Sequence, residues 1–315
     1  MDYDKNNENI IYVFLHIPKT GGITLRYHIE KNFKKNEFLL LYRSADAGLV
    51  NKEAVNKHIL AMPDNQRHKL KIIYGHEVYY GIHELFPNRT VRYITFFRSP
   101  FQLFSSFYNF SKYKIDHNNE WFKIEGRPQL LKDNDNYDLD KLICTRDNLD
   151  LAYQFLVARF LTDDFRTNYD YPENIVSLEK IKNILNKFYF IGLAEESEDF
   201  LFIYKKLGIN KFFVNRNKTK KSYFNSNDLQ IKQQIKSKMQ FDARLYEYAF
   251  EINKYFKKNS KDFYKLTEDS ASLNFIKVLY FIPDLLSNIV YNILRKFGLI
   301  NLVEYYVYGQ KNNMK

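Results

Sequence analysis

The sequence predicts an α/β protein in which a central parallel sheet is flanked by helices. Residues 10–17, 70–74 and 91–97 are short runs of β-branched and aromatic residues, the composition of strands buried on both faces. Each run gives way to polar, glycine-rich or proline-containing sequence, and helical spacing follows the first and the third. Strands that alternate with helices along a chain form parallel sheets, so we expect one layer of strands between layers of helices.

The first unit is a strand, a glycine turn and a helix. The strand over residues 10–17 stops at Pro18, and two consecutive glycines follow. Apolar residues then recur at every fourth position from Leu25 to Phe33, which predicts a helix that begins near Ile23 or Thr24.

The strand over residues 91–97 begins a second unit of the same kind. Pro100 marks the start of a helix, which places Arg98 at the strand end and Ser106 about two turns into the helix. Residues 112–140 are polar and lack periodicity, so we expect a long surface excursion. The later predicted elements are helices over residues 148–161 and 177–186, a strand over 188–193, a helix over 196–207 and one or two helices within 228–257.

The composition is that of a folded chain with excess positive charge. Of its 315 residues 45% are hydrophobic and 17% aromatic, which excludes disorder for most of the chain. There are 48 Lys and Arg against 37 Asp and Glu, a formal net charge of +11. This charge favours an anionic partner, which could be nucleic acid, lipid headgroups, a phosphate-rich cofactor or an acidic glycan.

The single cysteine, Cys144, excludes an intramolecular disulfide and a cysteine-rich zinc site. The sequence shows no secretory signal, and the apolar stretch over residues 285–294 has about half the length that crosses a bilayer. We therefore expect a cytoplasmic protein. Residues 1–260 are predicted to form one domain, and residues 261–315 a basic, amphipathic helical extension that packs on the core, mediates dimerisation or touches a membrane surface.

The glycine turn after the first strand has the features of a phosphate-binding loop. Such a turn directs backbone N–H groups and the positive end of a helix dipole at one point in front of the sheet. Gly21 and Gly22 would let the backbone approach an anion closely, and Lys19 could place an ammonium on it. Thr20 and Thr24 could add hydroxyl donors. The lysine precedes the glycines, so the turn is not a Walker A loop, and it does not fit the dinucleotide-binding pattern either.

A second element suited to phosphate follows the strand over residues 91–97. Its arginine, Arg98, offers a planar fork of donors, and Ser106 offers a hydroxyl toward the same sheet edge. This combination suits a terminal phosphate monoester. Taken without the first loop, Arg98 could equally pair with a surface carboxylate.

Together the two motifs resemble the 3′-phosphoadenosine 5′-phosphosulfate (PAPS)-dependent sulfotransferases, in particular the carbohydrate branch that includes heparan sulfate 2-O-sulfotransferase. The resemblance spans about residues 10–250. In that family a PKTGG-type loop binds the 5′-phosphosulfate, and an RxP segment with a serine eight residues after the arginine binds the 3′-phosphate. The matching residues are Pro18, Lys19, Thr20, Gly21, Gly22 and Thr24 in the loop, and Arg98, Pro100 and Ser106 in the second segment. Residues 74–83, 190–195 and 242–248 also resemble family segments, in the same order.

The resemblance implies a P-loop-like three-layer fold and transfer of a sulfuryl group from PAPS to a hydroxyl, with release of 3′-phosphoadenosine 5′-phosphate (PAP). The acceptor would be a carbohydrate or glycoconjugate, and neither a metal ion nor a nucleic acid is expected. His76 would be the base, since an imidazole with a pKa near roughly 6.5 suits proton abstraction at neutral pH, with Glu77 and His83 as alternatives. Lys19 would stabilise the charge on the leaving phosphate.

The resemblance also extends to a basic loop that, in the family, closes over the nucleotide. Its matching residues are Asn217, Lys218, Lys220 and Lys221, although a solvated loop is an equal interpretation. The remaining histidines, apart from the alternative base His83, are expected to be structural: His16, His28, His58, His68 and His117.

Three positions depart from the family pattern. Ile23 replaces a frequent hydroxyl residue, Ser99 a common acidic residue, and Glu77 a frequent aromatic one, which leaves the acceptor type open. Two other functions also stay open. An ATP-dependent, kinase-like transferase would bind ATP with Mg²⁺, and a non-catalytic binder of an anionic polymer would show salt-dependent affinity without transfer.

Overall fold

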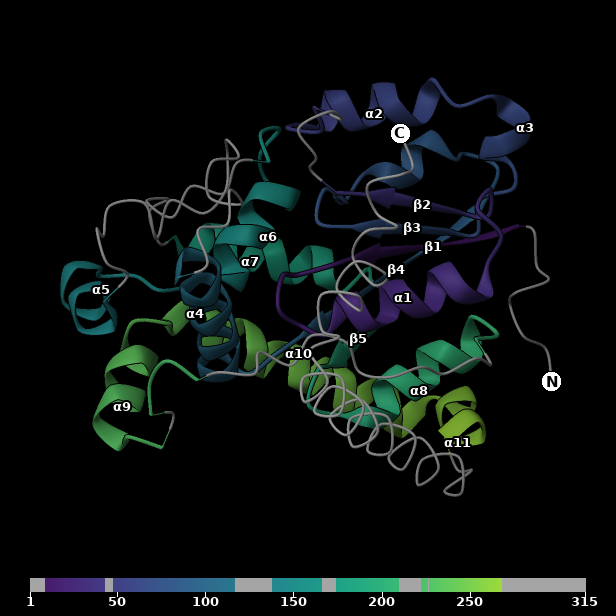
Figure 1. Cartoon of the computed structure of the whole chain (residues 1–315). Coiled ribbons are helices and arrows are strands. Elements are labelled where there is room, and N and C mark those ends of the chain that lie inside the picture. Colours follow the sequence, from purple (N-terminus) through teal and green to yellow (C-terminus); the bar gives the residue numbers. More distant parts are fainter. Residues whose placement is uncertain are drawn as a thin grey trace, which may run out of the picture.

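The computed structural model describes residues 9–42, 48–116, 138–165, 174–209, 222–225 and 227–267. Within them, five parallel strands form one sheet in the order β2-β3-β1-β4-β5 (Figure 1). The strands are β1 (Ile10–Leu15), β2 (Phe38–Leu41), β3 (Ile72–Gly75), β4 (Thr90–Phe97) and β5 (Phe190–Leu193). The predicted α/β class with a helix-flanked parallel sheet is confirmed.

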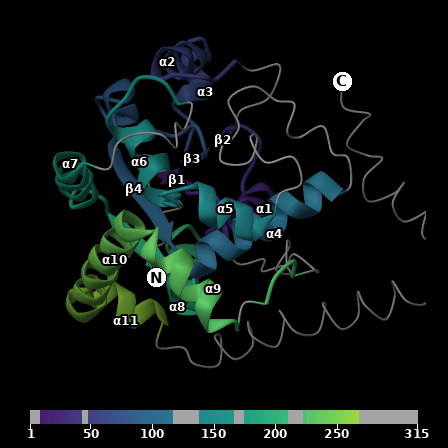
Figure 2. The ribbon, with the colours of Figure 1, turned by 90° about the vertical axis from the view of Figure 1, so that its left-hand side faces the viewer.

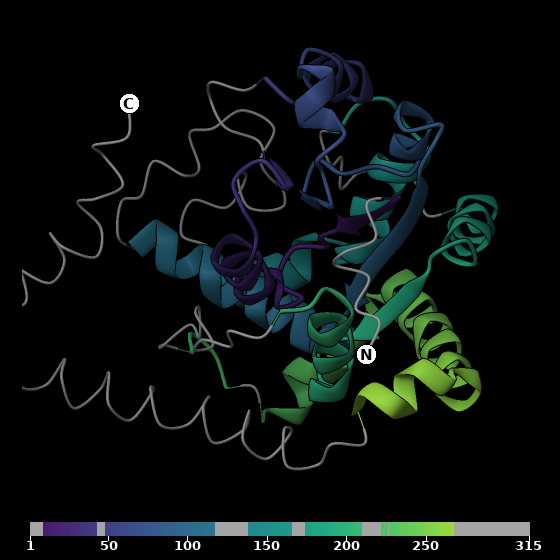
Figure 3. The same ribbon diagram turned by 90° about the vertical axis from the view of Figure 1, so that its right-hand side faces the viewer.

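Helices cover both faces of the sheet. They are α1 (Gly22–Asn32), α2 (Lys52–Leu60), α3 (Asp64–Arg67), the 3₁₀ helix η2 (Ile82–Leu85), α4 (Pro100–Asp116), α5 (Leu139–Thr145), α6 (Ala152–Phe160), α7 (Ile175–Leu185), α8 (Ser197–Lys206), α9 (Leu229–Ser237), α10 (Gln240–Asn259) and α11 (Lys261–Thr267). Figures 2 and 3 show α1 on one side of the strands and α7 and α10 on the other.

The two layers of helices are needed because successive side chains of each strand point to opposite faces of the sheet, and both faces are apolar. In β1, Tyr12 and Phe14 face a core shared with α1, α8 and α11, whereas Ile11 and Val13 face a core shared with α2, α4, α6, α7 and α10. Every residue of β1 is buried. A strand buried on both faces reads as a continuous apolar run, the pattern that predicts it from sequence.

The predicted elements are present with shifted ends, whereas β2, α2, α3, η2 and α5 escape prediction. β2 and α2 lie between the first predicted helix and the strand at β3. The expected surface excursion is shorter than predicted at its start, because α4 continues as a helix to Asp116. α5 begins at Leu139, and residues 117–137 lie outside the described residues.

Two buried carboxylates join α6 to α10. Asp242 accepts hydrogen bonds from the backbone N–H groups of residues 151–153, at the start of α6. Asp150 in return accepts from the N–H groups of Phe241 and Asp242, at the start of α10. Each carboxylate therefore caps the positive end of the other helix. Burial raises the pKa of Asp242 to about 6.

The start of the C-terminal extension packs against α8. The Lys206 ammonium lies 2.7 Å from a carboxylate oxygen of Asp262, and the buried Phe263 ring contacts Phe202 and Phe256. The rest of the extension, residues 268–315, lies outside the described part of the chain.

Candidate functional site

The register of the sheet brings three predicted site segments to one edge. Leu15 at the end of β1 pairs with Gly75 at the end of β3, so His16 and His76 leave the sheet side by side. β4 ends at Phe97 and Arg98 follows on the other flank of β1. In parallel α/β sheets, the carboxyl ends of the strands are where ligands bind.

The loop between β1 and α1 is shaped by two left-handed residues. Lys19 has φ 70° and Gly21 has φ 88°, which turn the chain sharply into the helix. The Thr20 hydroxyl, fully buried, donates to the Ile17 carbonyl at 2.8 Å. The Thr24 N–H bonds the Gly21 carbonyl at 3.2 Å. The hydroxyl proton of Thr20 is therefore used within the loop itself.

The two glycines are needed for different structural reasons. Gly21 is the N-cap of α1 in the left-handed region and, having no side chain, makes no capping hydrogen bond to this helix. At Gly22 an added Cβ would lie 2.1 Å from Nε2 of His16, so this glycine makes room for the imidazole. The positive end of α1 thus faces the sheet edge behind a glycine N-cap, which favours an anion there.

Lys19 lies among other cations beside an aromatic ring. Its Nζ is 4.1 Å from the centroid of the Phe110 ring, and Lys114 approaches the same ring at 5.6 Å. Burial, together with the charges of Arg98 and Lys114, lowers the pKa of Lys19 to about 8. A bound anion would favour the charged form of Lys19, and so would offset both the repulsion by its neighbours and the cost of its desolvation.

Arg98 is attached to the loop that carries Lys19. Its Nη1 donates to the Lys19 carbonyl at 3.1 Å, and burial lowers its pKa. Ser106 lies farther along α4, where Phe110 and Lys114 follow at four-residue spacing. These three residues therefore share one helix face, and its middle member contacts Lys19. Phe110 and Lys114 were not among the predicted site residues, although their four-residue spacing from Ser106 indicates a shared helix face.

His76 stacks on His16 at the edge of the sheet. Their ring centroids are 4.3 Å apart at an interplanar angle of 23°, and Tyr42 contacts His76 edge-on. Nδ1 of His76 lies 2.8 Å from the His16 carbonyl, which can only accept, so Nδ1 carries the proton. In the neutral ring, Nε2 is then the basic nitrogen.

His16 is buried behind His76 and held by two phenols. Its Nδ1 lies 3.0 Å from the Tyr42 hydroxyl and 3.1 Å from that of Tyr74. Burial and the neighbouring His76 and Lys19 hold the pKa of His16 well below its usual value. His16 is thus a neutral ring on which His76 stacks, a role that was not predicted from the sequence.

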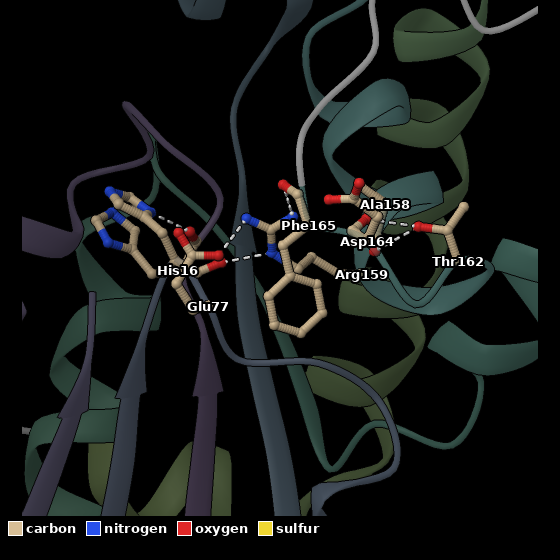
Figure 4. Close-up of polar contacts among 8 residues, drawn as sticks. His16, Glu77, Ala158, Arg159, Thr162, Asp164 and Phe165 are labelled. Carbon is tan, nitrogen blue, oxygen red and sulfur yellow. Dashed lines mark hydrogen bonds and ion pairs between the residues drawn. The ribbon is translucent and has the colours of Figure 1, made fainter. Parts of the chain in front are cut away.

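A buried ion pair anchors the backbone of His76. Arg159 donates from Nε to the His76 carbonyl at 2.6 Å, from Nη1 to the Phe165 carbonyl at 2.8 Å and from Nη2 to Glu77 at 2.7 Å. Figure 4 shows Arg159 between Glu77 and Phe165. Sequence analysis missed Arg159, since no local pattern connects it to a residue 82 positions earlier.

The two alternative bases occupy different surroundings. Glu77 is buried and paired with Arg159, with side-chain exposures of 5% and 3%. His83 is half-buried, and its Nδ1 lies 3.0 Å from the hydroxyl of Tyr93, in the middle of β4 rather than at its end. His76 contacts the segment after β1 through the His16 carbonyl. The predicted nucleotide-closing residues Asn217, Lys218, Lys220 and Lys221 lie outside the described residues.

The described residues contain no group of three or more His, Cys, Asp or Glu side chains arranged to hold a metal ion. No helix among them has the length and hydropathy needed to span a membrane.

Comparison with known proteins adds no family to this picture. No protein-family model matches the chain, and a search of curated proteins gives no significant match.

Proposed function

We propose that the chain is a PAPS-dependent sulfotransferase that acts on a hydroxyl of a carbohydrate or glycoconjugate. The supporting observation is that one sheet edge gathers a helix N-terminus with a glycine N-cap, Lys19 and Arg98 beside an imidazole, His76, with a defined tautomer. A cytoplasmic location, with peripheral membrane contact through residues 262–315 as the alternative, is part of the proposal.

The loop side of the edge suits a doubly phosphorylated donor. The 5′-phosphosulfate would bind the N-terminus of α1 and the Lys19 ammonium. The 3′-phosphate would bind Arg98, whose guanidinium is joined to the loop, with Ser106 on α4 as a further donor. Because Arg98 and Lys114 both repel Lys19, an anion bound there stabilises the Lys19 ammonium.

The chemical step is an in-line transfer of the sulfuryl group. As the acceptor oxygen forms a bond to sulfur, the bond from sulfur to the bridging phosphate oxygen breaks and its electron pair stays on the phosphate. The acceptor proton passes to Nε2 of His76, and Lys19 stabilises the charge that develops on PAP. A neutral imidazole is required before the step, and neutral His16 beneath it adds no repelling charge.

A thermal-shift titration tests the donor assignment. We expect PAP to stabilise the full chain more than ADP at equal concentration, because a ligand at about a hundred times its dissociation constant contributes about 2.7 kcal/mol. ATP with Mg²⁺ should give no larger shift than ADP. A shift with ATP and Mg²⁺ alone would instead indicate a kinase-like transferase. Incubation with PAPS and a glycan panel then tests transfer.

Replacing Arg98 with alanine tests the 3′-phosphate assignment. The affinity for PAP should fall much more than the affinity for ADP, since only PAP carries the 3′-phosphate. Ligand titration of both nucleotides with both proteins gives the two ratios. Arg244→Ala, at an exposed arginine of α10, is the control. Equal losses for PAP and ADP would contradict the assignment.

The affinity for PAP should depend on pH through Lys19. Its pKa of about 8 means that the ammonium is lost as pH rises through 8, whereas the bound anion favours the protonated form. Binding therefore takes up a proton above pH 8, and the affinity should fall by up to about tenfold for each pH unit.

Lys19→Gln removes this titration and supplies the comparison. Its affinity for PAP should be lower at pH 7 and flat between pH 7 and 9, whereas Lys35→Gln, at an exposed lysine, should follow the wild-type curve. Calorimetry in two buffers of different ionisation enthalpy measures the proton uptake directly. A wild-type curve without slope in this range would show that Lys19 does not contact the anion.

A further inference from the structure

A polar pocket of about 440 Å³ lies between the start of α2, the segment after His76 and the turn after α6. Its lining includes the half-buried Tyr80 and the buried Tyr79, together with Asn56, Glu53 and Glu84. The function proposed above does not use it.

The lining offers what a polyhydroxylated ligand needs. The Tyr79 hydroxyl donates to Oδ1 of Asn56, which leaves the amide NH₂ of Asn56 as a donor. Glu53 and Glu84 have no hydrogen-bonding or ionic side-chain partner within the described ranges, so each can accept from ligand hydroxyls. Carboxylates bind hydroxyl donors more strongly than neutral acceptors do. Aromatic rings complement the C–H faces of a sugar.

The charge of the lining selects against acidic ligands. Glu53, Glu84 and Asp163 contribute three carboxylates, whereas Lys52 is the one cation among the residues that line the pocket. The Lys52 ammonium lies 3.5 Å from Asp163 and 5.6 Å from the centre of the Tyr79 ring. Although the chain carries a net charge of +11, this pocket would repel a sulfate, a phosphate or a uronate.

The pocket is joined to the candidate base by a short, braced segment. His76 and Tyr79 are three residues apart, a separation of at most about 11 Å. On the opposite wall, Asp164 forms a β-bridge with Asn51, and the following Phe165 carbonyl accepts from the arginine that also bonds His76. The same ion-pair network therefore sets the position of the pocket wall and of the base.

We propose that this pocket is an acceptor subsite for an uncharged saccharide, which holds one unit of a glycan while a hydroxyl of a neighbouring unit meets His76. The inference rests on the proposed sulfotransferase function for its acceptor role. It narrows the acceptor class from carbohydrates in general to neutral glycans.

Binding of the full chain to an array of neutral and uronic-acid-containing oligosaccharides, with PAP present, tests the subsite. Neutral oligosaccharides should bind and acidic ones should not. For a bound neutral oligosaccharide, Glu84→Gln should weaken the affinity about fivefold or more, since it replaces a charged acceptor with a neutral one. Glu247→Gln, at an exposed carboxylate of α10, should leave the affinity unchanged. Glu84 is exposed, so its replacement does not threaten folding.

The outcomes separate the subsite from the proposed function. Absence of neutral oligosaccharide binding, preference for acidic ones, or equal affinity of Glu84→Gln and Glu247→Gln would overturn the subsite, even where PAP binds. Neutral oligosaccharide binding that is sensitive to Glu84, in a protein that fails to bind PAP, would overturn the acceptor role and the sulfotransferase proposal together. It would support a sugar site of another function.

Discussion

Replacing His76 with alanine is expected to lower the rate of sulfuryl transfer by about 10²–10⁴-fold while leaving the affinity for PAP nearly unchanged. A positioned general base contributes a factor of this size. The proposed donor-binding groups lie on the β1–α1 loop, at the end of β4 and on α4, so loss of the imidazole removes none of them.

The geometry around His76 explains why its replacement should act on the chemical step. Its Nδ1–H is held by the His16 carbonyl at 2.8 Å, and its ring is stacked at 4.3 Å on a neutral His16. Both contacts orient Nε2 before an acceptor arrives. Preorganisation of this kind is what makes a base effective in the transition state.

His83→Ala is the matched control, since it removes an imidazole from the same segment of chain. His83 bonds Tyr93 in the middle of β4, so this variant should retain transfer within a few fold of the wild type. Transfer rates at saturating PAPS and the thermal shift with PAP are measured for both variants. Normal turnover by His76→Ala, or a greater loss in His83→Ala, would remove His76 as the base.

Much of the fold could be predicted from sequence because buried parallel strands consist of continuous apolar runs. β2 escaped because Phe38–Leu41 is only four residues long at the edge of the sheet, where periodicity does not distinguish a strand from a buried helical turn. α2 buries only Val55 and Ile59, so its apolar stripe is thin. The residue that could have indicated this helix is its N-cap, Asn51, whose side chain accepts a hydrogen bond from the Ala54 N–H at 2.8 Å.

In the candidate site too, the residues whose position depends on local sequence could be predicted, and those that depend on tertiary contacts could not. The loop and Arg98 could be proposed from sequence because their geometry follows from a strand end and the next helix. The hydroxyl of Thr20 was expected to face a ligand, but its hydrogen bond to Ile17 turns it inward. The support of His76 by Arg159 depends on a tertiary contact, and a single sequence carries no periodicity or spacing that records one.

That tertiary contact leads to the largest expected effect on stability. Arg159→Leu should lower the free energy of unfolding by about 3–5 kcal/mol, because it removes the buried guanidinium that pairs with the buried Glu77 carboxylate. The carbonyls of His76 and Phe165 also lose their donor. Urea unfolding measures the change, and Arg67→Leu, which breaks an exposed ion pair with Asp64, should cost less than about 1 kcal/mol.

The double variant Arg159→Leu/Glu77→Leu separates the charge from the hydrogen bonds. It should recover part of the stability lost in Arg159→Leu, because no buried charge remains unpaired, while the two carbonyls still lack a donor. A double variant no more stable than Arg159→Leu would show that the hydrogen bonds to the backbone, rather than the ion pair, hold this edge together. A single variant as stable as Arg67→Leu would contradict the bracing of His76 by Arg159 altogether, since both the pair and the carbonyl bonds would then be dispensable.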